Sequence, residues 1–489
     1  MREWRWPILI VLLALPVVLL LAGYRIPGFE PAAPVAKPMA VPGGDREIAW
    51  IHTTTNATTW ERFVAGVVRV QLVVPEVRVD DTMAFLDSTT AVPELVLSHT
   101  RHAGKLRIRW YKLQNEVSAQ DWVEALSRRD PAPLAVIGGG STDRAIDLAR
   151  ALAAQDRWIG ERPPLLITTA TADEGDDGSG TIVRLVDLYE RRTFRFCFTN
   201  GHMAEAVLDF ALSHPDVRPL DEDGHADRLT MLSVFWEDDR YSSDLQERFS
   251  EAFVGKVPDP SKRNFSALWK IPFSVGGLET PNSYELQYAQ NIAQHLEALQ
   301  ERRVLLVIPA ITQPAKRLLK SILQERPGVA AKLAVVTGDG IPINAILRDG
   351  EFAWPVRSMP VPLVLFAHSD PTAWDRIGTE APIGYRFSKP TSTEEAMHFG
   401  ELARVLLGMC WTDSGTVRDG KDLTERLNAR SEFFDGRGER RFNTGEHVVV
   451  VLPKRDGPEL SVWRRAMNKP WTVITTIRIG SGGAFGVPP

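Results

Sequence analysis

A glycine-rich turn between a short apolar segment and a helical pattern is the part of the sequence best suited to bind a ligand. Residues 135–137 predict a buried strand, residues 138–143 read Gly-Gly-Gly-Ser-Thr-Asp, and a helix is expected over 144–154. In a parallel sheet such a turn places backbone N–H groups and the Ser141 hydroxyl at the carboxyl edge, where doubly wound folds bind ligands and a helix start favours anions. The alternative is a plain strand-to-helix turn with a helix cap.

Sequence motifs for other chemistries do not occur. The turn is not GxGxxG, there is no Walker lysine and no GxSxG elbow, and the ten histidines show no nucleophile–base arrangement. An acidic, glycine-rich stretch over 173–180 could be a calcium loop, but it lacks the EF-hand spacing, so a solvated loop is expected. We therefore expect no cofactor, no metal and no catalytic residues.

Composition sets the class of protein. A chain of 489 residues is expected to form more than one globular unit, and 44% hydrophobic with 24% charged residues is typical of a body that folds in water. A formal net charge of -5 without a basic cluster argues against a nucleic-acid partner. Cys197 and Cys410 fit no metal spacing and are interpreted as buried apolar thiols, with a long-range disulfide left open.

The N-terminus predicts export. Arg2 and Arg5 precede an uncharged run over 6–24, so residues 1–25 are expected to be a signal peptide or transmembrane anchor with the body on the extracytoplasmic or periplasmic face. The run is close to the ~20 apolar residues of a membrane span, and no clean A-x-A cleavage site ends it, which favours an uncleaved anchor. The prolines within residues 26–46 predict an extended linker.

From residue 47 onward, β-rich runs alternate with helical patterns, which predicts an α/β protein with mostly parallel sheets. Strands are expected at 48–52, 106–111, 135–137, 165–168, 194–198, 229–235, 304–308, 333–337 and 362–366. The segment over 73–101 is unusually long for a connection between a helix and a strand of such a unit.

Several short motifs also occur in a suggestive order. Ala-Val-Ile-Gly at 135–138 with Ser141 is followed by Ile-Thr-Thr-Ala-Thr at 167–171, then by Phe-Arg at 194–195 and a strand-to-helix segment centred on Tyr241. The most specific segment runs over 423–452, with Phe-Phe-Asp-Gly-Arg-Gly-Glu at its centre. This order resembles the type I periplasmic-binding-protein fold, in its leucine/isoleucine/valine-binding-protein branch of ABC transporter substrate-binding proteins, over about residues 47–479.

The resemblance implies two doubly wound parallel-sheet lobes joined by a three-strand hinge that close on a ligand. Lobe I would comprise residues 47–195 and 373–430, and lobe II residues 196–372 and 431–479. Residues 480–489 would form a flexible tail.

The resemblance also implies ligand contacts by position. In lobe I these are Ser141, Thr169, Ala170 and Thr171, which would hold a carboxylate or amide. In lobe II, Tyr241 would be a lid residue, Ile311 or Thr312 follows a strand, and Asp339 lies near where the family places an acidic residue for a ligand ammonium. The alternatives are a half-buried aromatic at a helix start for Tyr241 and a plain turn aspartate for Asp339.

Three functions remain in competition. The leading hypothesis is a solute-binding protein that delivers an amino-acid-like or amide-like ligand to a membrane permease. The second is a membrane-anchored ligand-sensing module that signals through a partner, and the third, a hydrolytic enzyme, is disfavoured by the missing nucleophile–base arrangement.

Overall fold

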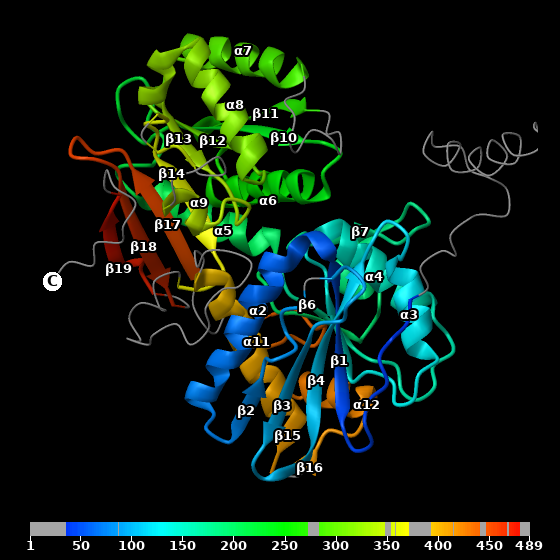
Figure 1. Cartoon of the computed structure of the whole chain (residues 1–489). Helices are drawn as coiled ribbons and strands as arrows, with labels where there is room; N and C mark the ends of the chain where they lie inside the picture. Colours follow the sequence, from blue (N-terminus) through cyan, green and yellow to red (C-terminus); the bar gives the residue numbers. More distant parts are fainter. Residues whose placement is uncertain are drawn as a thin grey trace, which may run out of the picture.

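The computed structural model describes residues 36–86, 88–271, 283–347, 354–356, 358–370, 393–413, 415–440, 446–466 and 469–479 (Figure 1). The expected N-terminal anchor and C-terminal tail lie outside these residues, as do parts of the linker and of both expected lobe segments beyond residue 370. No helix within the described ranges is long and apolar enough to span a membrane.

The first sheet has the strand order β2-β3-β4-β1-β5-β6-β9. Its strands are β1 (Arg46–Thr53), β2 (Val77–Asp80), β3 (Glu94–His99), β4 (His102–Leu113), β5 (Ala135–Gly138), β6 (Leu165–Ile167) and β9 (Thr193–Arg195). Strands from β4 to β9 pair in parallel, whereas β2 and β3 pair antiparallel at the edge. The long segment over 73–101 therefore widens the sheet.

Helices cover both faces of the first sheet (Figure 1). They are α2 (Ala57–Val73), α3 (Ala119–Ser127), α4 (Thr142–Ala154), α11 (Thr393–Cys410) and α12 (Gly420–Asn428). Side chains of a strand point alternately to opposite faces, so Ile48 and Trp50 pack with α2 and α11, while Ala49 and Ile51 pack with α3 and α4. Helix α11 thus returns from late in the chain to complete the first lobe.

The second sheet has the order β11-β10-β12-β13-β14-β17-β18-β19. Its strands are β10 (Leu229–Trp236), β11 (Arg263–Ile271), β12 (Val304–Val307), β13 (Leu333–Val336), β14 (Leu363–Ala367), β17 (Glu446–Leu452), β18 (Glu459–Arg465) and β19 (Thr472–Arg478). The first five positions are parallel and the last three antiparallel. Helices α5 (Asn200–Ser213) and α6 (Arg240–Lys256) share a core on one face, and α7 (Ser283–Ala298) and α8 (Thr312–Glu325) share one on the other.

Shorter elements complete the described chain. They are β7 (Glu174–Asp176) with β8 (Ile182–Arg184), β15 (Trp411–Thr412) with β16 (Gly415–Thr416), α9 (Ile343–Leu347), and the 3-10 turns η1 (Thr54–Asn56), η2 (Leu185–Asp187), η3 (Pro260–Lys262) and η5 (Pro327–Lys332). The stretch over 173–180 falls within the β7–β8 hairpin.

The chain passes between the two sheets three times: after β9, after β14, and before β17. These passages bring the carboxyl ends of the parallel strands of both sheets toward the junction of the lobes (Figure 1). Cys197, which follows β9, and Cys410, at the end of α11, are both free and buried in different cores, which confirms the prediction of apolar thiols. Burial raises the pKa of each thiol to about 12.

Candidate functional site

The turn after β5 is built for close approach. Gly139 has a φ of +78°, and a Cβ added there would lie 2.7 Å from the Cβ of Ala145 in α4. A Cβ on Gly140 would lie 2.0 Å from Nε2 of His52. Side chains at either position would therefore push the turn away from α4 and β1.

His52 forms the floor beneath this turn. Its ring stacks on Trp50 with 4.6 Å between centroids, and its Nδ1 accepts the Thr53 N–H at 3.1 Å. Burial, together with the charge of Arg144, lowers the pKa of His52 to about 3. The ring is therefore a neutral packing surface at physiological pH.

Ser141 is the N-cap residue of α4, but its side chain makes no capping hydrogen bond. Its carbonyl accepts the Ala145 N–H at 3.0 Å, as the helix requires, while the side chain remains partly exposed. The hydroxyl and the first-turn amides are thus available to an incoming acceptor or donor. The alternative interpretation, that the Ser141 side chain caps the helix, is therefore wrong.

The segment after β6 lies beside this turn. Thr169 is partly exposed, and its hydroxyl donates to the Gly139 carbonyl at 3.2 Å. Ala170 and Thr171 are each only 1% exposed, and their carbonyls accept from Cys197 and from the Asn200 N–H. Of the lobe I contacts predicted from sequence, Ser141 and Thr169 are partly exposed, whereas Ala170 and Thr171 are buried.

The three lobe II residues predicted from sequence lie together. The Tyr241 hydroxyl donates to Oδ1 of Asp339 at 3.0 Å and accepts the Gly340 N–H at 3.0 Å. Thr312, at the start of α8, donates to the Gly340 carbonyl at 3.4 Å. Burial and the Asp339 carboxylate raise the pKa of Tyr241 well above its ordinary value, so the phenol stays protonated.

Two histidines that sequence reasoning missed join the lobes. His368, just after β14, has its Nε2 2.8 Å from Oδ2 of Asp339. Its ring lies 5.4 Å from the ring of His398 in α11, and Nε2 of His398 donates to the Thr168 carbonyl at 2.8 Å. The available signal for His368 was its position two residues after a predicted strand, whereas His398 lies in a helix and had no such signal.

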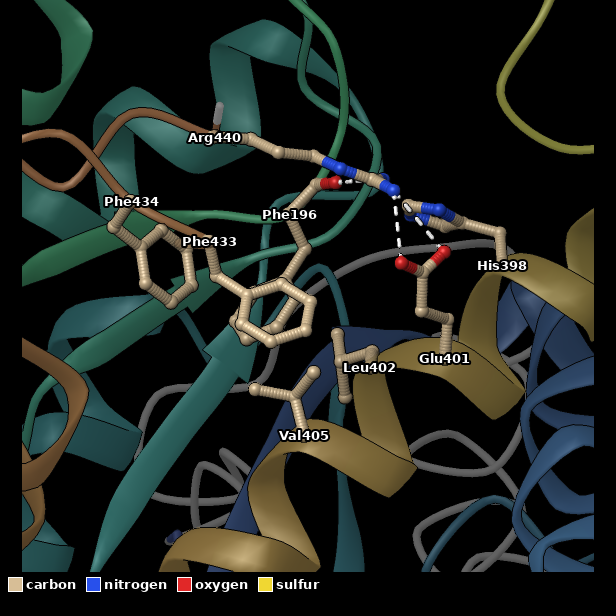
Figure 2. Close-up of a pocket in the computed structure, with 8 residues that line it drawn as sticks. All are labelled: Phe196, His398, Glu401, Leu402, Val405, Phe433, Phe434 and Arg440. Carbon is tan, nitrogen blue, oxygen red and sulfur yellow. Dashed lines mark hydrogen bonds and ion pairs between the residues drawn. The ribbon is translucent and has the colours of Figure 1, made fainter. Parts of the chain in front are cut away.

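Arg440 connects the chain segment after β9 to helix α11. Figure 2 shows its guanidinium between the Phe196 carbonyl and Glu401, with His398 alongside. It donates to the Phe196 carbonyl at 2.7 Å and to both carboxylate oxygens of Glu401 at 3.1 and 3.0 Å, and it lies 4.8 Å over the Phe198 ring. The small cavity below, of about 10 Å³, holds at most one water molecule.

A second bridge between the lobes is ionic. The Asp173 N–H donates to Oδ2 of Asp244 in α6 at 3.1 Å, and Oδ2 of Asp173 accepts the Gly201 N–H at 2.8 Å. Arg248 pairs with Glu174 at 2.9 Å. Asp244 is fully buried, and that burial raises the pKa of its carboxyl to about 6.

Among the comparisons with known proteins, the one with solved structures bears on the fold. No protein-family model matches the chain, and no curated protein sequence does. An ABC transporter substrate-binding protein from Desulfitobacterium hafniense is similar in structure, with a TM-score of 0.50 and 12% identity over 88% of this chain and 100% of that one. The chain has the type I periplasmic-binding-protein fold.

Two other solved structures are similar at lower scores. One is a solute-binding protein of an R. palustris ABC transporter in complex with 4-hydroxybenzoate, with a TM-score of 0.47 and 11% identity over 89% of this chain and 97% of that one. The other is a putative branched-chain amino acid ABC transporter from Rhodospirillum rubrum, with a TM-score of 0.46 and 12% identity over 88% and 100%. At such scores and identities, neither structure identifies the ligand of this chain.

One group of potential metal ligands occurs within the described part of the chain, in the segment that precedes β10 and thus away from the carboxyl ends of the strands. Asp221, His225 and Asp227 have ligand atoms within 4.8 Å of one another on a surface loop. Oδ1 of Asp221 already accepts the His225 N–H at 2.7 Å, so the loop's own geometry accounts for their proximity.

Proposed function

We propose that this protein binds a small amino-acid-like or amide-like solute between its two lobes, on the extracytoplasmic side, as the substrate-binding component of an ABC-type transporter. In this proposal the N-terminal segment anchors the body to the membrane, and a permease is the partner. Ser141, Thr169, Ala170 and Thr171 bind from lobe I. Tyr241, Thr312 and Asp339 bind from lobe II.

One observation carries the proposal: a continuous series of contacts joins the strand ends of the two sheets. Thr168 is bonded to His398, His398 lies against His368, His368 is bonded to Asp339, and Asp339 to Tyr241. The strand end beside Thr169 in lobe I is thus linked to Tyr241 and Asp339 in lobe II through two histidines. Such convergence at the carboxyl ends of parallel strands is where α/β folds bind ligands.

The candidate groups are poorly suited to catalysis. A nucleophilic serine needs a neighbouring base, and the Ser141 hydroxyl has no hydrogen bond to a histidine within the described residues. The pKa of His52, the histidine beneath the turn, is about 3, which makes it a weak base. The Cys197 thiol is buried with a pKa of about 12, so little thiolate forms. These properties favour a binding protein over a hydrolase.

A thermal-shift screen of the full-length protein against amino acids, amides and small carboxylates tests the proposal. A ligand at 100 times its Kd stabilises the folded state by about 2.7 kcal/mol, which is a measurable rise in Tm. We expect at least one compound of these classes to raise the Tm. No rise with any of them contradicts the proposal.

Two serine variants make the screen specific to the site. Ser141→Ala is expected to abolish the ligand-induced rise while leaving the Tm of the free protein nearly unchanged, because Ser141 does not cap its helix. Ser118→Ala is the matched control. Ser118 accepts the Asp121 N–H as the cap of α3, so its replacement should lower the free energy of unfolding by about 1 kcal/mol and leave the ligand-induced rise in Tm intact. An unchanged rise in Ser141→Ala would remove Ser141 from the site.

A further inference from the structure

The Asp339 carboxylate is already shared between two donors of the protein. Oδ1 lies 3.0 Å from the Tyr241 hydroxyl and Oδ2 lies 2.8 Å from Nε2 of His368. We call Tyr241, Asp339, Gly340 and His368 the Asp339 cluster. The side chain of Asp339 is only 18% exposed and that of His368 9%.

The directions of these hydrogen bonds follow from their other partners. The Phe198 N–H points at Nδ1 of His368 at 3.4 Å, so the imidazole proton lies on Nε2 and is donated to Asp339. The Gly340 N–H donates to the Tyr241 oxygen, so the phenol directs its own proton to Asp339. Each carboxylate oxygen therefore accepts a proton from a fixed, largely buried donor.

An ammonium group needs a carboxylate partner when it leaves water, because an unpaired buried charge is strongly unfavourable. Among the seven positions predicted to contact the ligand, Asp339 is the only acidic one. A zwitterionic ligand would have to share Asp339 with Tyr241 and His368, or displace one of them.

Two further carboxylates, Asp239 and Asp143, lie at the starts of α6 and α4. Asp239 caps α6 by accepting the Tyr241 N–H at 3.2 Å. Asp143 lies in the first turn of α4, where burial and the charge of Asp147 raise the pKa of its carboxyl in spite of Arg144 and Arg240. Asp239 therefore has a backbone partner within the protein, and Asp143 holds its proton more readily than an exposed aspartate does.

We propose that the Asp339 cluster makes this site selective for ligands that carry a carboxylate or amide and no α-ammonium group. This inference rests on the proposed function, and it makes His368 a specificity-determining residue. The ligand's carboxylate or amide would bind at Ser141 and the first-turn amides of α4. The surface of the Asp339 cluster would face the ligand as a closed hydrogen-bonded patch.

Compounds with the same side chain, with and without the amino group, test the inference. The probes are leucine, 4-methylpentanoate and 4-methylpentanamide, then phenylalanine, 3-phenylpropanoate and 3-phenylpropanamide, each titrated into the full-length protein by calorimetry and by thermal shift. In at least one series we expect the acid or amide to bind about tenfold or more tightly than the amino acid, since the ammonium group must compete with Tyr241 and His368 for the Asp339 oxygens.

Two variants test whether the cluster is the cause. His368→Leu frees Oδ2 of Asp339, and Tyr241→Phe frees Oδ1 while keeping the ring. Each variant should lower the ratio of the Kd of the amino acid to the Kd of its deaminated partner by about tenfold. Circular dichroism and the free Tm report whether each variant folds, and either folded variant suffices. A preference unchanged in the folded variants overturns the role of the cluster.

The outcomes separate the two proposals. Amino acids that bind as tightly as their deaminated partners, or more tightly, overturn the selectivity inference and leave the proposed function standing. If none of these probes binds, and no member of the broader screen does, the proposed function fails and the inference with it.

Discussion

Replacing Arg440 tests whether one side chain holds together the passages between the lobes. Arg440→Met removes the guanidinium that bonds the Phe196 carbonyl and both oxygens of Glu401, and it leaves a methylene stem of similar length. The Arg440 side chain is 7% exposed and that of Glu401 25%, so Glu401 loses its partner in a mostly dry setting. We expect the free energy of unfolding to fall by about 3 kcal/mol, near the lower end for breaking a buried ion pair because Glu401 keeps some contact with water.

The assay is urea unfolding of wild type, Arg440→Met, Glu401→Met and the double variant. The double-mutant cycle should give a coupling of about 2 kcal/mol, as expected for charge-assisted hydrogen bonds from one guanidinium nitrogen to both carboxylate oxygens. Arg455→Met is the control, since Arg455 is exposed on a turn, and it should change stability by about 0.5 kcal/mol or less. A loss in Arg440→Met no larger than that of the control, or a coupling near zero, refutes the reasoning.

Further predictions concern other parts of the site. Because burial raises the pKa of Asp244 to about 6 in the folded protein from the ordinary 3.8, this group favours folding at low pH, and its contribution is lost as pH rises between about 4 and 6. Urea unfolding at pH 4 to 8 should therefore show that the free energy of unfolding falls more steeply between pH 4 and 6 for wild type than for Asp244→Asn. The same pH dependence in both proteins would contradict this prediction. Gly140→Ala should lower the free energy of unfolding by about 1–3 kcal/mol, because the new Cβ meets His52, and it should also reduce ligand affinity. Gly43→Ala is the control, since a Cβ there meets nothing within 4 Å, and it should change neither quantity. If Gly140→Ala changes neither quantity, the turn geometry is wrong. A thiol reagent should modify neither Cys197 nor Cys410 in the folded protein and both in denaturant, and rapid labelling of the native protein would show that the cores are open.

Local patterns made the fold predictable. The strand, Gly-Gly-Gly-Ser turn and helix at 135–154 are set by neighbours in sequence, and the structure places β5 and α4 there. The order of such units along the chain then determines a doubly wound architecture. The edge strands β2 and β3 were not predicted, because the segment over 73–101 carries no feature that marks it as joining the sheet antiparallel rather than connecting a helix to a strand.

The site was predictable only in part, because its decisive contacts span long sequence separations. Tyr241 and Asp339, which bond to each other, are 98 positions apart, and a resemblance to known motifs was what suggested both. His368 and His398 had no motif, and Arg440 lies 244 positions from the Phe196 carbonyl that it binds. Tertiary packing, rather than any local pattern, selects these partners.

A calorimetric titration with one variant from each lobe tests the central claim most directly. The tightest compound of the screen is titrated into full-length wild type, Ser141→Ala and Tyr241→Ala. If the ligand lies between the lobes, wild type binds one ligand per chain and each variant binds it at least about tenfold more weakly, since each removes a contact from a different wall. Wild-type affinity in either folded variant would contradict a site formed by both lobes.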